Sequence, residues 1–458
     1  MEKKVDILVI GGSAAGTVAA STAKSKHPDK SILLVRKEEK SVVPCGIPYI
    51  FGTLGSSERN IMPDTGLENA GIDIRIDTVK SIDKKKKVAT FENGEALVFD
   101  KLVLGTGSKP FKPDWLKGGN LGNVFTIPKN KVYLDQLQKD LKGKKHITVV
   151  GAGFIGVEMS DELKKSGVDV TLVEIQKRIL GLAFDEEIAA DAEEKLIKDG
   201  VEVRTGVGVK ELLGEKNVSK VLLSDDSVIE TDAVILTMGY RPNVDLAKAM
   251  GLKINDHGFI SVDAYMRTSE KDIFAAGDCA EKRDFATSRL STTMLASTAA
   301  AEARVAGLNL YSLSTYRSFK GTIGIYSTMI GDTVYGVAGI TEEAAKKEGF
   351  AVIGTTFKGM DRHPGKLPGM HSQTVKLVVS KGTGTILGGE VIGGESAGEL
   401  INVLGVIIQT GSTINDVLTM QIGTQPMLTA SPGQYPIIKA AEIASRNISG
   451  CCAPNEYC

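Results

Sequence analysis

The sequence has few aromatic residues, almost no net charge and no long apolar run. Aromatic side chains make up 5% of the 458 residues, with a single tryptophan, so stacking on nucleic-acid bases is not indicated. Lysine and arginine number 55 and aspartate and glutamate 56, which predicts no general attraction to nucleic acid or to an acidic membrane surface. No stretch of about 18 consecutive apolar residues occurs, so we expect no membrane span.

Cysteine is also scarce, since the sequence contains only five, and three of these lie within the last eight residues. A disulfide framework would spread its cysteines along the chain, so this distribution is typical of a protein from a reducing compartment. The apolar N-terminal stretch contains acidic residues and several glycines, which argues against a secretory signal peptide. We therefore expect a cytoplasmic protein.

Glycine, in contrast, is abundant, with 51 residues. Gly151, Gly153 and Gly156 form a G-x-G-x-x-G turn between an expected strand at 147–150 and an expected helix at 157–166. The glycines permit a tight turn, close approach of a pyrophosphate and packing of helix on strand, while the free N–H groups at the helix start favour anions. This segment predicts a dinucleotide site.

The residues around this turn indicate which dinucleotide binds. Glu174 ends the next expected strand, where a carboxylate can accept hydrogen bonds from the adenosine ribose hydroxyls and disfavours a 2′-phosphate. We therefore expect NADH, although Lys177 and Arg178 nearby leave NADPH open. Ile155 lies within the turn, and Glu158 on the following helix is expected to order the nicotinamide end of the site.

An earlier copy of the same pattern occurs at the N-terminus. Gly11 and Gly16 match the first and last glycines of the turn, but Ser13 replaces the middle glycine. Arg36 stands where an acidic residue usually ends the second strand. This βαβ duplication predicts a second dinucleotide site, to which we assign these four residues.

Two further segments complete the N-terminal copy. An apolar strand leads into Thr106 and Gly107, and a similar strand later leads into Gly239. Residues 273–279 form a short apolar strand that ends in Gly277 and Asp278, and an aspartate there can hydrogen-bond the ribityl chain of a flavin. We therefore expect FAD at the first site.

The C-terminal third of the sequence changes character at about residue 321. Strand-like segments separated by turns predict an antiparallel sheet flanked by two helices, and hence a third, α+β domain. The expected strands are 322–327, 334–339, 352–357, 375–379 and 386–392, and the expected helices are 342–348 and 396–410.

Together these motifs resemble the FAD- and NAD-linked pyridine nucleotide-disulfide oxidoreductases over nearly the whole chain. The resemblance implies an α/β fold with two Rossmann-like domains and a C-terminal α+β dimerisation domain, and hence a homodimer or higher homo-oligomer. It also implies that the helix start from Ala296 to Ala299 faces the flavin. The implied domains are 1–117 with 250–320 for FAD, 118–249 for NAD, 321–450 for dimerisation, and a cysteine-rich tail, 451–458.

Cys45 carries the expected chemistry, in the segment Val-Pro-Cys-Gly-Ile-Pro-Tyr. A Cys-Gly turn at a helix start is expected to lower the thiol pKa and to favour the nucleophilic thiolate. Dithiol members of the family carry a second cysteine where this sequence has Ile50. Cys45 is therefore expected to cycle through a sulfenate, or through a mixed disulfide or persulfide.

Single-cysteine members of the family fall into two main groups. Peroxidases and water-forming oxidases carry a histidine where this sequence has Ala14. Coenzyme A-disulfide and CoA-persulfide reductases lack that histidine, and the segment around Cys45 is similar to theirs. Lys24 and Lys26 are candidates to bind the phosphates of coenzyme A, or they form an ordinary solvated face. The tyrosine pair typical of coenzyme A-disulfide reductases is absent, and Gln425 replaces a catalytic histidine of dithiol members.

The tail contains Cys451, Cys452 and Cys458. It resembles the vicinal cysteine pair of mercuric reductases, which implies either a carrier of sulfane sulfur or of a soft metal, or thiols without a role. We expect no resident metal. The sequence thus predicts an NADH-dependent flavoprotein that reduces CoA persulfides, polysulfides or small disulfides, with a peroxide-forming NADH oxidase or a rubredoxin- or ferredoxin-type electron-transfer reductase as alternatives.

Overall fold

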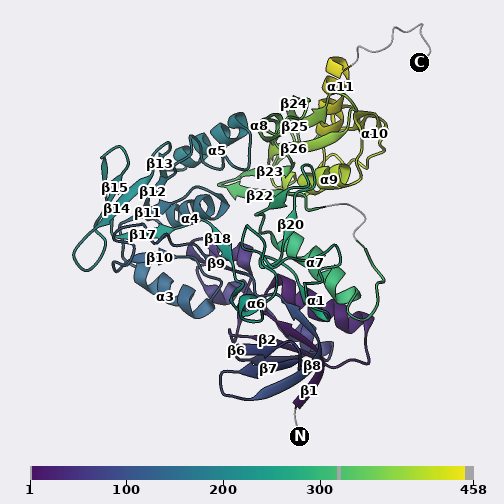
Figure 1. The fold of residues 1–458 in the computed structure, drawn as a ribbon. Coiled ribbons are helices and arrows are strands. Elements are labelled where there is room, and N and C mark those ends of the chain that lie inside the picture. The colour runs from purple at the N-terminus through teal and green to yellow at the C-terminus, as the bar shows by residue number, and fades with distance from the viewer. Residues whose placement is uncertain (1–2, 317–320, 449–458) are drawn as a thin grey trace.

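The computed structural model describes residues 3–316 and 321–448, which form three main sheets with their helices (Figure 1). In the first sheet the strand order is β5-β2-β1-β8-β7-β6, and β19 also pairs with β8. The strand β1 pairs in parallel with β2 and β8, whereas β6 and β7 form an antiparallel hairpin. The strands are β1 (Lys3–Ile10), β2 (Ile32–Arg36), β5 (Asp73–Ile76), β6 (Val79–Asp83), β7 (Val88–Phe91), β8 (Ala96–Leu104) and β19 (Ile273–Ala275).

Two long helices, α1 (Ala14–Lys26) and α7 (Ala296–Leu308), pack on each other beside this sheet. Their approach is close at Gly307, where a Cβ would lie 2.9 Å from the carbonyl oxygen of Ala19. Short elements complete the region. They are β3 (Ser41–Val42), η1 (Pro44–Gly46), η2 (Pro48–Phe51), η3 (Ser57–Asn60), β4 (Ile61–Met62), α2 (Thr65–Asn69), α6 (Asp245–Ala249), β20 (Lys282–Arg283) and β21 (Leu290–Ser291).

The second sheet is entirely parallel, with the order β10-β17-β11-β12-β13. Its central strand β11 is buried from Ile147 to Val150, as expected for a parallel strand covered on both faces. The elements of this region are β9 (Ser108–Pro110), β10 (Val124–Thr126), α3 (Lys131–Leu141), β11 (His146–Val150), α4 (Phe154–Lys165), β12 (Asp169–Val173), α5 (Glu186–Lys198), β13 (Glu202–Arg204), β14 (Val209–Leu213), β15 (Lys220–Leu223), β16 (Val228–Glu230), β17 (Ala233–Leu236) and β18 (Tyr240–Pro242).

The third sheet is antiparallel, in the order β22-β23-β26-β25-β24, as the sequence predicts. Two helices were not predicted, α10 and α11, although α11 buries Ile437, Ala440, Ala441 and Ala444 at helical spacing. The elements are β22 (Ile325–Ile330), β23 (Thr333–Gly339), α8 (Glu342–Lys347), β24 (Val352–Met360), β25 (Ser372–Ser380), β26 (Ile386–Gly393), α9 (Ala397–Gln409), α10 (Ile414–Thr419), η4 (Pro432–Gln434) and α11 (Pro436–Ile448). The predicted fold class is confirmed.

The second and third sheets are joined by a shared core. The β22–β23 hairpin lies beside α4 and α5 (Figure 1), and Ile330 and Tyr335 of the hairpin belong to the same buried cluster as Val157 and Ile188 of these helices. The third sheet therefore packs directly on the helices that follow the second glycine-rich turn.

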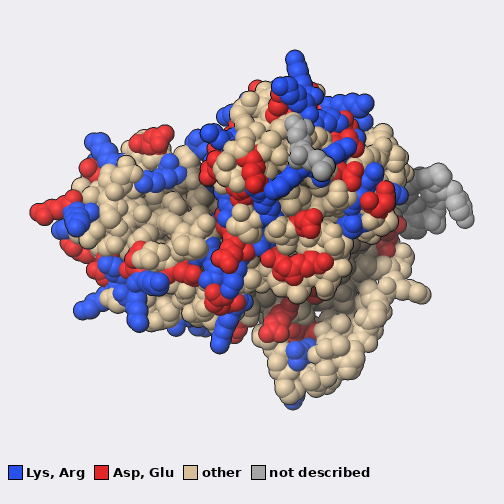
Figure 2. Space-filling model, turned by 90° about the horizontal axis from the view of Figure 1, so that it is seen from below, with Lys and Arg blue, Asp and Glu red and all other residues tan. Residues whose placement is uncertain are grey.

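The surface carries charges of both signs. On the face seen in Figure 2, basic and acidic side chains are interspersed rather than gathered into one large patch. Among the helices that the structure describes, none is both long and apolar enough to cross a membrane.

Candidate active site

Cys45 lies in the single turn of 3-10 helix that Pro44 opens, and its side chain is exposed. The loop is held by its neighbours: the Asn60 side-chain amide donates to the carbonyl of Val43 at 3.0 Å. A Cβ at Gly46 would lie 2.0 Å from Oδ1 of Asn60, so only glycine fits beside the cysteine. Exposure and a rigid surrounding backbone present the sulfur to a reactant.

The sequence predicts a lowered pKa for the Cys45 thiol, and this prediction is wrong, because the pKa is raised. Burial of the surrounding loop and the carboxylate of Glu158 raise the pKa of Cys45, and Lys129 opposes them without prevailing. The helix start that we expected to lower this pKa is only three residues long and therefore lacks the aligned peptide dipoles of a longer helix. In this structure Cys45 is thus a thiol at neutral pH, and a proton acceptor is needed to form the thiolate.

The Cys45 loop packs directly on α4, the helix that follows the second glycine-rich turn. Glu162 accepts hydrogen bonds from the backbone N–H of Thr53 at 2.6 Å and from its hydroxyl at 3.0 Å. A Cβ at Gly52 would lie 2.4 Å from the carbonyl oxygen of Glu162. Burial and the carboxylate of Glu158 raise the pKa of Tyr49 in the same loop. The cysteine and the coenzyme helix therefore form one site.

Glu158 lies on the part of α4 that influences both Cys45 and Tyr49. The hydroxyl of Thr328, on β22, donates to its Oε1 at 2.8 Å. Burial raises the pKa of Glu158 to about 7; the hydrogen bond from Thr328 opposes this shift, and the charges of Glu162 and Asp161 add to it. A carboxyl group with this pKa can both accept and release a proton at neutral pH.

Lys129 and Asp278 form an ion pair on the side of the site where we expect the flavin. The Lys129 ammonium lies 2.7 Å from Oδ2 of Asp278, and the Ser108 hydroxyl donates to the same oxygen at 2.7 Å. Burial acts to raise the pKa of Asp278, but Lys129 and Ser108 hold it below its ordinary value. The sequence predicted Asp278 but not Lys129, whose role depends on the folding of distant segments.

Both glycine-rich turns fit a bound dinucleotide. The helices α1 and α4 begin at Ser13 and Gly153 without a side-chain cap and without an acidic residue in the first turn, so their N–H groups suit a phosphate. A Cβ at Gly16 would lie 1.7 Å from the carbonyl oxygen of Gly11, and one at Gly156 would lie 1.8 Å from that of Gly151. Glycine is therefore required at these positions by packing alone.

Other glycines of the predicted sites face open space. No protein atom lies within 4 Å of a Cβ built at Gly153, Gly107 or Gly239, which suits the close approach of a ligand. Ile155 follows in the first turn of α4 and packs against the core of the second sheet.

Glu174 directly follows β12, and its side chain reaches the second glycine-rich turn. Its carboxylate accepts the backbone N–H of Ala152 at 2.6 Å. The two basic residues that left NADPH open are engaged by acids: Lys177 pairs with Glu186 at 3.0 Å, and Arg178 pairs with Glu186 and Glu193. Acidic neighbours therefore compensate the charges of both basic residues.

The remaining predicted residues are placed as follows. The hydroxyl of Thr106 donates to the carbonyl of Asn243 at 2.6 Å. Gly277 donates its N–H to Glu302 at 2.9 Å and packs on Ala299 of α7, which Ala296 begins. These contacts place the Gly277 turn against the first half of α7.

Two of the predicted assignments receive no support from the geometry. The Arg36 guanidinium is buried and bonded to both carboxylate oxygens of Asp64 and to loop carbonyls, so its donors are engaged by protein groups. Lys24 donates to the carbonyls of Pro28 and Lys30. Lys24 and Lys26 end α1, about 18 Å along the helix from its glycine-rich turn. The predicted role of the tail cysteines lies outside the described residues.

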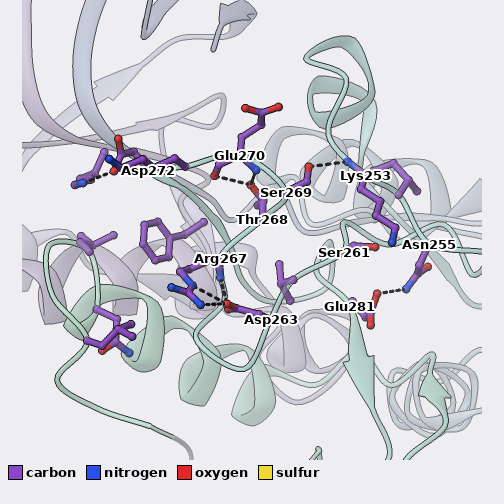
Figure 3. A pocket seen from close by; sticks show the side chains of 18 of the residues that line it. Lys253, Asn255, Ser261, Asp263, Arg267, Thr268, Ser269, Glu270, Asp272 and Glu281 are labelled. Atoms are coloured by element: carbon purple, nitrogen blue, oxygen red, sulfur yellow. Dashed lines mark hydrogen bonds and ion pairs between the residues drawn. The ribbon is translucent and has the colours of Figure 1, made fainter. Parts of the chain in front are cut away.

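A recess of about 980 Å³ lies away from this site (Figure 3). It borders the start of β19 and the end of α7, at the edge of the first sheet opposite the glycine-rich turn. Its charged groups mainly pair with one another, as Arg267 does with Asp263 and Lys101 with Asp272. A smaller recess of about 630 Å³ includes Gly239 and therefore borders the coenzyme side.

Two glycine-rich turns at the ends of parallel strands, with an exposed cysteine whose loop packs on α4, define an oxidoreductase that binds two dinucleotides. The chain belongs to the pyridine nucleotide-disulphide oxidoreductase family. The family model matches residues 5–303, and the model of its dimerisation domain matches residues 325–434. Membership confirms the predicted enzyme class, which uses FAD and a pyridine nucleotide.

Several characterised proteins are similar over nearly the full length. An NADH oxidase of Methanocaldococcus jannaschii is 30% identical, covering 96% of this chain and 99% of its own. An NAD(P)H coenzyme A polysulfide/persulfide reductase of Pyrococcus horikoshii is 31% identical, covering 97% and 98%. The structure of an NAD-dependent persulfide reductase from A. fulgidus superposes with a TM-score of 0.89 at 29% identity, covering 96% of this chain and 83% of the other.

Proposed function

We propose that this protein is an NADH-dependent flavoprotein reductase of coenzyme A persulfides, polysulfides or low-molecular-weight disulfides. The observation that carries the proposal is Cys45, an exposed cysteine packed against the coenzyme helix, with Cys279 buried and Ile50 where a partner cysteine would stand. Both cysteines of the described residues are free thiols, so Cys45 has no disulfide partner among them and is expected to react with an external sulfur. The names of the Pyrococcus and A. fulgidus relatives support sulfur as the substrate.

The cofactors would occupy the two turns described above. FAD would lie along Gly11–Gly16 and Asp278, and NADH along Gly151–Gly156 with Glu174 at the ribose. When bound, the flavin supplies a path for the electron pair from the nicotinamide to the sulfur centre. Glu158 and Lys129 flank this path on the protein side.

The chain itself supplies the nucleophile and the proton acceptor. Glu158, whose charge acts on Cys45 and whose pKa of about 7 lets it accept a proton at neutral pH, is the proposed acceptor of the thiol proton. The thiolate attacks the terminal sulfur of RS–SH, so that a Cys45–sulfur bond forms, the S–S bond of the substrate breaks and RS⁻ leaves. The electron pair of NADH then cleaves the new S–S bond, releasing HS⁻ and restoring the thiolate. In sum, RS–SH and NADH give RS⁻, HS⁻, NAD⁺ and H⁺.

A second candidate is an NADH oxidase that forms hydrogen peroxide. The Methanocaldococcus relative with that name favours it. In this reaction O₂ takes the electron pair of NADH with two protons, and Cys45 is not required. Electron transfer to a rubredoxin or ferredoxin would also proceed without Cys45.

The decisive experiment compares the wild type with Cys45→Ser, both loaded with flavin, in anaerobic NADH oxidation with CoA persulfide. We expect rapid turnover of the wild type and loss of turnover in Cys45→Ser. The matched control is Cys279→Ala, which removes a buried thiol and should keep the activity. If neither the wild type nor Cys45→Ser responds to persulfide, while both consume NADH in air, the oxidase replaces the reductase as the function.

Our proposal includes the assembly. We assign residues 1–117 with 250–320 to the FAD domain, 118–249 to the NAD domain and 321–450 to dimerisation, with a homodimer in the cytoplasm as the working form. We keep Lys24 and Lys26 as candidate contacts for coenzyme A phosphates, to be tested by their effect on the KM for CoA persulfide.

A further inference from the structure

The third sheet places four residues in one row across its strands. Tyr326 pairs with Val337, Val337 with Glu390, and Glu390 with Lys376. Directly paired residues in an antiparallel sheet project to the same face. At one end of the row Tyr326 stacks on Phe154, with ring centroids 5.0 Å apart and planes 5° from parallel. The row therefore runs from the second glycine-rich turn to Lys376.

At its other end the row meets a buried cluster of charges. The Lys376 ammonium lies 2.7 Å from Asp185, 2.5 Å from Glu187, 3.3 Å from Glu342 and 3.8 Å from Glu390. The side chains of Lys376, Asp185 and Glu390 are 4%, 1% and 0% exposed. The buried Lys376 thus pairs with acids at the start of α5 and with acids of the C-terminal region. Removal of one partner from a buried ion pair is strongly destabilising.

Backbone hydrogen bonds tie the same residues together. The N–H of Asp185, at the start of α5, donates to Oε1 of Glu390 at 2.8 Å. The Asp185 carboxylate accepts the N–H groups of Glu342 and Glu343 at 3.0 and 2.9 Å, at the start of α8. Asp185 is therefore one of the residues that join the NAD-binding region to the C-terminal sheet.

The same face of the sheet contacts the proton-accepting group of the site. Thr328 follows Tyr326 by two residues on β22 and so projects to the same side. Its hydroxyl bonds Glu158, four residues after Phe154 on α4. Tyr335, opposite Thr328 on β23, donates its hydroxyl to Asp191 of α5 at 2.7 Å. The position of the row thus determines how the sheet meets α4.

We propose that the cluster of Asp185, Lys376 and Glu390 positions the coenzyme side of the active site, by holding the sheet in the place where Thr328 reaches Glu158 and Tyr326 covers Phe154. These are positioning residues, since none of them lies at the cysteine or at the glycine-rich turn. The inference rests on the proposed oxidation of NADH and is independent of the sulfur substrate.

The cluster also makes this positioning sensitive to alkaline pH. Burial and the charge of Asp185 raise the pKa of Glu390 to about 9, so at neutral pH it carries a proton. Above that pH, ionised Glu390 adds a further negative charge to the acidic side chains around Lys376, which is the buried cation that compensates them. The charged residues that face Glu390 or its partners come from α5, α8 and β25: Asp185, Glu187, Glu342, Lys346 and Lys376.

The test measures NADH-driven reduction of the flavin-loaded protein by anaerobic stopped flow between pH 6 and 10. Lys376→Met should slow reduction about ten-fold, as a small misplacement of reacting groups does. It should also shift the midpoint of the pH profile of this rate, near pH 7, to higher pH. The hydrogen bond from Thr328 lowers the pKa of Glu158, and this bond would be weakened in the variant. Lys346→Met is the matched control, since this exposed lysine touches the cluster only through Glu342.

Glu390→Gln provides the second arm, because it keeps the acceptor oxygen for Asp185 and removes the ionisable proton. We expect it to match the wild type near pH 7 and to lack the loss of rate above about pH 9. The inference is overturned if Lys376→Met folds and keeps both the wild-type reduction rate and the wild-type midpoint of the pH profile. It is also overturned if Glu390→Gln still loses reduction rate above about pH 9. If Lys376→Met does not fold, the result with Glu390→Gln decides. Reduction of the flavin by NADH does not require Cys45, so the same measurements can be made in a Cys45→Ser background. The proposed sulfur reduction can therefore fail while the inference about the cluster holds.

Discussion

At the scale of single residues, the reactivity of Cys45 depends on groups that are distant in the sequence. Burial and Glu158 raise its pKa and Lys129 lowers it. Lys129 follows β10 in a short loop, with nothing in its local pattern to indicate a role. Cys45 could be predicted because its flanking residues resemble a known motif. Its electrostatic environment could not, because that environment is assembled from three separate segments.

Lys129→Met should make the Cys45 thiol less reactive. Loss of the nearby cation raises the thiol pKa further and leaves the charge of Asp278 uncompensated, which acts in the same direction. We expect alkylation of Cys45 by iodoacetamide at pH 8 to slow about three- to ten-fold, equivalent to at most about one pKa unit. Lys131→Met is the control, since Lys131 pairs with Asp135 and Glu58. An unchanged alkylation rate would show that Lys129 does not act on Cys45.

At the scale of elements, the local patterns were reliable where strand, turn and helix follow one another. The second turn lies between β11 and α4, within a few residues of the expected bounds, because apolar strands and glycine packing are local properties. The turn of Pro44–Gly46 was taken for the start of a helix. It ends after one turn, and Pro48, which has no backbone N–H to continue a helix, opens a second short 3-10 turn.

Two alanine substitutions in the second turn should separate packing from ligand binding. Gly156→Ala places a Cβ 1.8 Å from the carbonyl oxygen of Gly151, so the backbone must shift, at a cost of about 1–3 kcal/mol in the free energy of unfolding. Gly153→Ala has open space and an ordinary φ of −72°, so stability should be kept while NADH binds more weakly. Urea unfolding and NADH titration test this. Equal loss of stability in both variants would contradict the geometry.

At the scale of the whole molecule, the joint between the coenzyme half and the C-terminal sheet is rich in buried acids. Glu158 and Glu390 both have pKa values above that of an unfolded glutamate. At these two groups the folded chain therefore binds more protons than the unfolded chain above about pH 4.5, the ordinary pKa of a glutamate. The contribution of these groups to stability consequently falls as the pH rises, until about pH 7 for Glu158 and about pH 9 for Glu390.

Glu390→Gln should accordingly flatten the alkaline side of the stability profile. The amide cannot ionise in either state, so the loss of stability between pH 6 and pH 9 should be smaller than in the wild type. Urea unfolding at both pH values measures the difference, with Glu187→Gln, at an exposed carboxylate of the same cluster, as the control. An identical pH dependence in Glu390→Gln and the wild type would show that Glu390 is already ionised at neutral pH.

The sequence by itself determined the class of fold, the two dinucleotide turns, Glu174 and the lone Cys45, because each depends on residues that are neighbours along the chain. Only the tertiary structure showed that Lys129 meets Asp278, that Thr328 bonds Glu158, and that Lys376 joins α5 to the C-terminal sheet. These contacts join residues that are 149, 170 and 191 positions apart in the sequence. Burial then changes the pKa of Cys45 and Glu158, and burial is a property of the packed chain rather than of its local pattern.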